Sequence, residues 1–138
     1  MNDDNSVQPI DTHERLARFV LFSSWVRKSD QTVKPDAFIP HPYPDLSVTR
    51  HLSLSEKALW RVGQEVAKNR PAKMYGRADL NVVDAMDLKL AVHPHPVFGN
   101  PNHANVVGWP PDKPAQKIIA MELAAAAIFV SSPRIAEG

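Results

Sequence analysis

The sequence predicts an α+β fold, in which a small antiparallel or mixed sheet of about four or five strands carries two amphipathic helices on one face. Three observations lead to this prediction. Two segments combine helix start signals with apolar residues at helical spacing. Several shorter segments alternate apolar and polar residues, as half-buried strands do. The two kinds of segment do not alternate strictly along the chain, which disfavours a parallel sheet built from βαβ units.

The clearest helix lies within Ser53–Arg70, and we expect residues 55–68 to be helical. Ser53 at the N-cap and Glu56 three residues later form a capping box. Pro71 prevents the helix from continuing. Apolar side chains recur on one face, at Leu59, Val62 and Val66, with Trp60 beside them.

A second helix is expected within Asp112–Val130, over residues 114–129. Asp112 can cap it, and Pro114 suits its first turn. The alanine run 124–127 has high helix propensity and a thin profile, which favours close packing on a sheet. The residues expected to face the core are Ile118, Ile119, Leu123, Ala126, Ala127 and Val130.

Alternation predicts the strands. The candidate segments are residues 18–22, 46–50, 73–82, 88–92 and 104–109. Residues 83–86 fit a single helical turn. Within 46–50, the side chains of Leu46, Val48 and Arg50 share one face.

Length and composition indicate one soluble domain. The chain has 138 residues, 43% hydrophobic and 22% charged, which is ordinary for a globular domain. We expect residues 13–131 to form it, between flexible tails at 1–12 and 132–138. Cysteine is absent, which excludes disulfides, thiolate metal ligands and cysteine nucleophiles.

Net charge and hydropathy limit the classes of partner that we expect. The formal net charge is +1 with no long basic run, so no dedicated nucleic-acid surface is expected. No apolar run is long enough to span a membrane. The start, MNDDNSVQP, is acidic, the reverse of a signal peptide, so we expect a cytoplasmic protein.

Prolines concentrate in two stretches, which we name the first proline segment, Phe38–Asp45, and the second proline segment, Pro94–Trp109. Each contains His-Pro steps and an aromatic residue, and each borders a predicted strand. Proline restricts the backbone before binding and so favours a pre-organised surface. We expect the two segments to lie side by side and to form the functional surface.

On this interpretation the chain binds a protein partner. The interpretation does not exclude a homo-oligomer. Tyr43 and Phe98 would be the aromatic anchors. Directional hydrogen bonds would come from His41 and His103. The full set of expected binding residues is His41, Tyr43, Phe98, Asn102, His103 and Trp109.

A metal site is the next alternative. His93 and His95, two apart in an extended segment, could both reach one ion. The ligands that could complete it are His41, His51, His103 and Asp45. Without an HExxH motif or cysteine, we expect no tightly bound metal and no cofactor.

An enzymatic site is the remaining alternative, with Arg50, His51 and His103 acting on a phosphate or nucleotide. The His51–Ser53 stretch resembles half of the H-x-S/T pattern of two-histidine phosphoesterases. The stretch that begins at His103 departs from that pattern. We therefore favour a non-enzymatic accessory module of an operon-encoded assembly over a small, toxin-like enzyme acting on a nucleotide or RNA.

The chain also resembles a group of short, uncharacterised bacterial single-domain proteins. The resemblance covers roughly Phe19 to Val130. It rests on Asp36-Ala37-Phe38 with Pro40, Leu46-Ser47-Val48 with Arg50, Pro94 to Pro96, Asn100-Pro101-Asn102-His103-Ala104 and Gly108-Trp109-Pro110. It implies a single bacterial domain and links the two proline segments, and it implies no catalytic residue.

Overall fold

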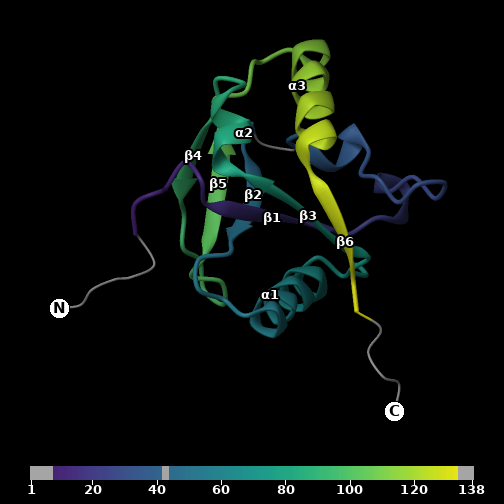
Figure 1. The fold of residues 1–138 in the computed structure, drawn as a ribbon, viewed down its shortest axis with the longest axis vertical. Coiled ribbons are helices and arrows are strands. Elements are labelled where there is room, and N and C mark those ends of the chain that lie inside the picture. The colour runs from purple at the N-terminus through teal and green to yellow at the C-terminus, as the bar shows by residue number, and fades with distance from the viewer. Residues whose placement is uncertain (1–7, 42–43, 134–138) are drawn as a thin grey trace.

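The computed structural model describes residues 8–41 and 44–133. Its described part contains one antiparallel sheet of six strands, in the order β4-β5-β2-β1-β3-β6 (Figure 1). The predicted α+β class is confirmed, with slightly more strands than expected. The strands are β1 (Arg15–Val20), β2 (Leu46–Arg50), β3 (Gly76–Asn81), β4 (Ala91–Pro94), β5 (His103–Val107) and β6 (Ile128–Ser131).

The helices among these residues are α1 (Glu56–Asn69), α2 (Val82–Met86) and α3 (Lys113–Ala126), with short 3-10 turns η2 (Ser23–Trp25) and η3 (Pro35–Phe38). The predicted cap of α1 is wrong by two residues. Ser55, not Ser53, is the N-cap, and its hydroxyl accepts a hydrogen bond from the Ala58 N–H at 3.1 Å. Ser53 instead lies in a turn that connects β2 to the helix. Asp112 caps α3 as predicted, accepting from the Ala115 N–H.

The two long helices cover opposite faces of the sheet, not one face as the sequence suggested (Figure 1). Neighbouring side chains of β1 separate the two cores, because they alternate across the strand. Leu16 joins the core beneath α3, α2 and η3, whereas Ala17 and Phe19 join the core beneath α1. Gly63 lets α1 approach closely, since a Cβ there would lie 2.5 Å from Phe19.

The predicted end of the second helix is also wrong. The helix α3 ends at Ala126, and the following residues form β6 along β3, where Phe129 pairs with Ala78. Gly76 makes room for this strand, because a Cβ there would lie 2.5 Å from the Val130 carbonyl oxygen. Ile118, expected in the core, is 63% exposed, whereas Leu123 is 1% exposed, as predicted.

The other predicted strands shift by a few residues. The strand β2 has the predicted bounds, but β1 begins and ends earlier than residues 18–22. The strands β3 and β4 start later than predicted, and β5 ends before Gly108. Within the described residues, no helix has both the length and the apolar character needed to cross a bilayer.

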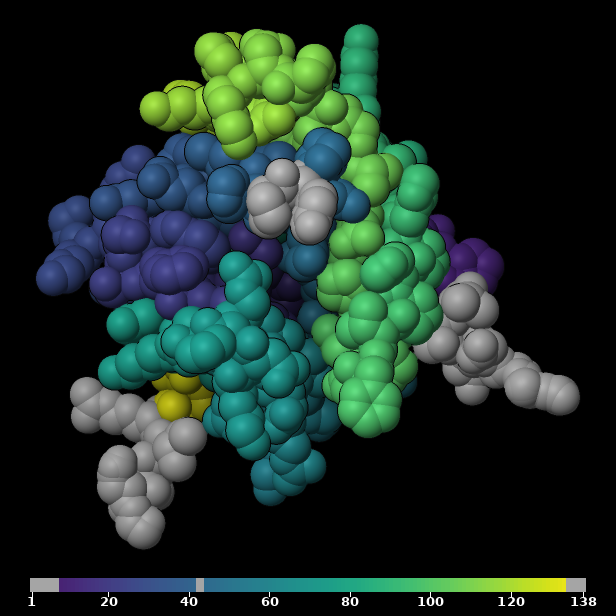
Figure 2. All heavy atoms as spheres, turned by 180° about the vertical axis from the view of Figure 1, so that it is seen from behind, coloured from purple at the N-terminus to yellow at the C-terminus, as the bar shows by residue number. Residues whose placement is uncertain are grey.

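The two proline segments do not lie side by side along their length. β2 and β5 are antiparallel, with Leu46 opposite Val106 and Thr49 opposite His103. The described residues of the first proline segment precede β2 and therefore lie toward the Trp109 end of the second. The loop between β4 and β5 lies at the other end of this strand pair (Figure 2).

Candidate anion-binding groove

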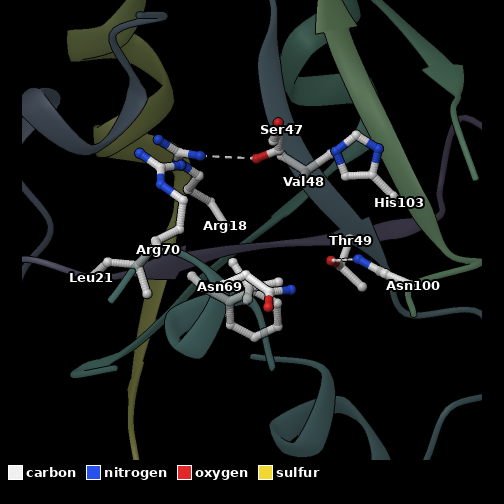
Figure 3. A pocket seen from close by; sticks show the side chains of 11 residues that line it. Arg18, Leu21, Ser47, Val48, Thr49, Asn69, Arg70, Asn100 and His103 are labelled. Atoms are coloured by element: carbon white, nitrogen blue, oxygen red, sulfur yellow. Dashed lines mark hydrogen bonds between the residues drawn. The ribbon is translucent and has the colours of Figure 1, made fainter. Parts of the chain in front are cut away.

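A groove of about 220 Å³ lies between β1, β2 and the C-terminal end of α1 (Figure 3). It forms because β1 and β2 pair at only two positions, Leu16 with Arg50 and Ala17 with Thr49, and leave an opening beyond them. Figure 2 shows this face of the molecule hollowed between α1 and β5. The polar side chains that line the groove are Arg18, Ser47, Thr49, Asn69, Arg70, Asn100 and His103.

Arg18 holds its guanidinium group rigidly at this groove. Its Nε donates to the Ala37 carbonyl at 2.8 Å, and Nη1 donates to the Ser47 carbonyl at 3.1 Å. The guanidinium carbon lies 5.2 Å from the centre of the Trp25 ring, a cation–π contact. Burial and the nearby charge of Arg70 lower the pKa of Arg18 to about 10, so the group stays cationic at neutral pH.

Arg70 brings a second positive charge to the same place. It is the C-cap residue of α1, is exposed, and directs its guanidinium toward that of Arg18 (Figure 3). Among the residues that the structure describes, no carboxylate lies within 4.0 Å of either guanidinium group. Two like charges therefore share one groove without an internal counter-ion.

Two further arginines of the sheet, Arg50 and Arg77, are neutralised by carboxylates. Arg50 is fully buried, forms an ion pair with Glu14, and donates to the carbonyl oxygens of Gln8 and Pro9. Gln8 and Pro9 fall within the segment predicted to be a flexible tail, and through these carbonyls they contact the sheet. Arg18 differs from Arg50, because it is half-buried and no carboxylate of the described residues pairs with it, whereas charges removed from water are ordinarily paired.

Arg77 joins a network between the sheet and α1. It donates to Asp79 at 2.9 Å and to Glu56 at 3.0 Å, and stacks 4.6 Å from the Trp60 ring centre. Burial alone would lower the pKa of Arg77, but hydrogen bonds to Glu56 and Asp79 and the charges of these carboxylates raise it. His51 completes the network, with its Nε2 atom 3.1 Å from Asp79 Oδ1.

These contacts separate the predicted catalytic residues. Arg50 and His51 follow one another in the chain, so they point to opposite sides of the sheet, and each is engaged with a carboxylate. His103 alone lines the groove. Its Nδ1 atom is 2.7 Å from the His95 carbonyl oxygen, and burial lowers its pKa.

The predicted binding residues are also dispersed. His41 is exposed beside the undescribed pair 42–43, so Tyr43 lies outside the described residues. Phe98 is fully exposed at the tip of the β4–β5 loop. Asn102 supports β2 by donating to the Arg50 carbonyl at 3.0 Å. Trp109 is only 7% exposed and donates to the Val106 carbonyl, so it fills the core.

The histidines do not gather into a metal centre. His93 is exposed on β4, and His95 pairs with His103, with 3.2 Å between their Nδ1 atoms. Across residues 8–41 and 44–133, no group of three or more His, Asp or Glu side chains is arranged to hold an ion.

Sequence reasoning missed Arg18 and Arg70. One signal was available, since Arg18 interrupts an apolar stretch, LARFVLF, where a charge needs a special partner. Arg70 gives no such signal, because a positive charge at the end of a predicted helix already suits the helix dipole. These residues are distant in the sequence, and only the packing of α1 against β1 brings them together.

The structure thus defines an α+β domain with a cationic groove beside its sheet. The chain matches no protein-family model, no curated protein and no solved structure in the comparisons. The functional argument therefore depends on the chemistry of the groove itself.

Proposed function

We propose that the protein is a non-enzymatic interaction module that binds an anionic group of a protein partner in this groove. One observation carries the proposal. Arg18 and Arg70 face each other without a carboxylate among the described residues, although Arg50 is paired with one carboxylate and Arg77 with two. An anion supplied by a partner would relieve the repulsion and complete the pairing.

The size of the groove favours a group that belongs to something larger. Sites that enclose whole drug-sized ligands usually measure about 300–1,000 Å³, and this groove measures about 220 Å³. Beside it lies a face of β2, β5 and β4 whose side chains Ser47, Asn105 and His93 are exposed or half-exposed. An extended protein segment could contact this face while its anionic group occupies the groove.

The alternative function is an enzyme acting on a nucleotide or RNA. His103 favours it, because a histidine with a lowered pKa is neutral at pH 7 and can accept a proton. Arg50 is held in an ion pair with Glu14, however, His51 is hydrogen-bonded to Asp79, and Thr49 in the groove accepts a hydrogen bond from Asn100. The groove thus offers His103 as the acid–base group, without the two predicted partners.

The test is capture of binding partners from a nuclease-treated lysate of the native host. The bait proteins are wild type, Arg70→Glu, and Arg61→Glu, a matched control with an exposed arginine on the same helix. We expect a protein retained by wild type and Arg61→Glu, with its affinity for Arg70→Glu reduced by more than about tenfold.

Two results would contradict the proposal. A partner that binds Arg70→Glu as well as wild type would show that the groove is not the contact. Nucleic acid captured from untreated lysate, together with turnover that His103→Ala abolishes, would establish the enzymatic alternative.

A further inference from the structure

We infer that the anion is a phosphate monoester on a phosphorylated side chain of the partner, an inference that rests on the proposed function. The first argument is charge. Arg18 and Arg70 present two positive charges, and a carboxylate supplies only one negative charge. A phosphate monoester carries about −1.5 to −2 at pH 7, which matches the pair.

The second argument is the number and arrangement of donors. Arg18 uses Nε and one Nη1 hydrogen to bond carbonyl oxygens, which leaves Nη2 without a hydrogen bond to the described residues. Arg70 reaches the groove from a different element (Figure 3). A planar carboxylate is satisfied by one guanidinium fork, whereas the oxygens of a phosphate can accept from two guanidinium groups at once.

The third argument is pre-organisation. The Trp25 ring and two carbonyl oxygens hold Arg18 in place before any ligand binds. Arg70 is exposed and can adjust to the ligand. A rigid cation at the back of the groove and an adaptable one at its rim reduce the entropy lost on binding.

The lining of the groove favours a phosphorylated protein over a nucleotide. Nucleotide and single-strand sites ordinarily stack bases on exposed aromatic rings. Phe19 is the aromatic residue in this lining, and it is only 6% exposed. The described lining therefore offers a base no exposed Phe, Tyr or Trp ring, and its one further ring, the half-buried imidazole of His103, is engaged by the His95 carbonyl oxygen.

The experiment is a titration of the full chain, followed by NMR or calorimetry, with defined probes. These are N-acetyl-phosphoserine amide, N-acetyl-glutamate amide, AMP and inorganic sulfate. We expect the phosphoserine derivative to bind at least about tenfold more tightly than the glutamate derivative, because of its second charge. Arg70→Gln should abolish this binding, and Arg61→Gln should preserve it.

A pH series gives an independent signature. The second ionisation of a phosphate monoester lies near pH 6, so affinity should rise several-fold between about pH 5 and 7.5. Sulfate keeps both charges across this range and reports any change that comes from His103. A phosphate affinity that follows the sulfate affinity at every pH would contradict the inference.

The outcomes separate the inference from the proposed function. Equal binding of the glutamate and phosphoserine derivatives would overturn the phosphate assignment and leave the anion-binding module intact. AMP binding more tightly than phosphoserine by about tenfold would overturn it in favour of a nucleotide. If no probe binds, and the partner captured from the lysate binds Arg70→Glu as tightly as wild type, both proposals fail.

Discussion

The surroundings of Arg18, Arg50 and Arg77 in the sheet decide the role of each. Arg50 and Arg77 meet carboxylates and therefore stabilise the fold, whereas Arg18 meets carbonyls, a tryptophan ring and Arg70. Carbonyl oxygens satisfy hydrogen-bond donors but carry no full charge. Arg18 is thus well bonded and still electrically unpaired, which is the state that an anion site needs before its ligand arrives.

At the scale of single residues, Arg50→Met should lower the free energy of unfolding by about 3–5 kcal/mol. The substitution leaves the Glu14 carboxylate, whose side chain is 6% exposed, buried without its partner. Urea denaturation monitored by circular dichroism measures the change. Arg15→Met, at an exposed position of β1, is the matched control and should alter stability by less than about 0.5 kcal/mol. Equal midpoints for the two variants would show that the Arg50 ion pair is dispensable.

At the scale of elements, short-range sequence patterns predicted the elements whose formation depends on neighbouring residues. The helix α1 and the strand β2 were predicted because helical spacing and alternation act over a few residues, although the capping serine of α1 was placed two residues too early. The alanine run before Ala127 concealed the end of α3. Its high helix propensity extends past the point where pairing of Ile128–Ser131 with β3 takes over.

The candidate site could not be predicted in the same way. The groove exists because β1 and β2 separate after two paired positions, and because α1 lies on the opposite face from α3. Both facts are matters of register and layer order, which alternation leaves undetermined. The sequence did identify His103 as a site candidate, and that histidine lines the groove.

The two faces of α3 offer an element-scale prediction. Leu123→Asp places an unpaired charge in the core between α3 and the sheet, and should destabilise the fold by several kcal/mol, roughly 3–5. Ile118→Asp, on the exposed face of the same helix, is the matched control and should change stability little. Thermal unfolding compares the two. An unchanged melting temperature for Leu123→Asp would mean that this face of α3 is solvated.

At the scale of the whole molecule, the groove lies on the same face of the sheet as the polar network that joins α1 to the sheet. The network of Glu56, Arg77, Asp79 and His51 joins the N-terminal end of α1 to the sheet, and Arg70 lies at its other end. The position of Arg70 therefore depends on how α1 is seated. Stability of this layer and affinity for the anion should change together when the network is weakened.

Acidification tests the network across the whole molecule. Burial would raise the pKa of Asp79, but hydrogen bonds from His51 and Arg77 hold it below its usual value. A carboxyl with a lowered pKa in the fold stabilises it above the unfolded pKa, near about 4, and this contribution disappears as pH falls through the lower folded value. Glu56 shifts in the same direction, because its hydrogen bond to Arg77 lowers its pKa, but it is mostly exposed and should contribute little.

We therefore expect the free energy of unfolding of the wild type to fall between about pH 4 and 2. Asp79→Asn should be less stable at pH 7 by roughly 1–3 kcal/mol and should show a flatter profile in that acid range. Asp36→Asn, at an exposed carboxylate, should run parallel to wild type. Urea unfolding at pH 7, 4, 3 and 2 gives the three curves. If Asp79→Asn loses stability on acidification as steeply as wild type, the ion-pair network does not hold α1 against the sheet. The position of Arg70 must then be explained by apolar packing alone.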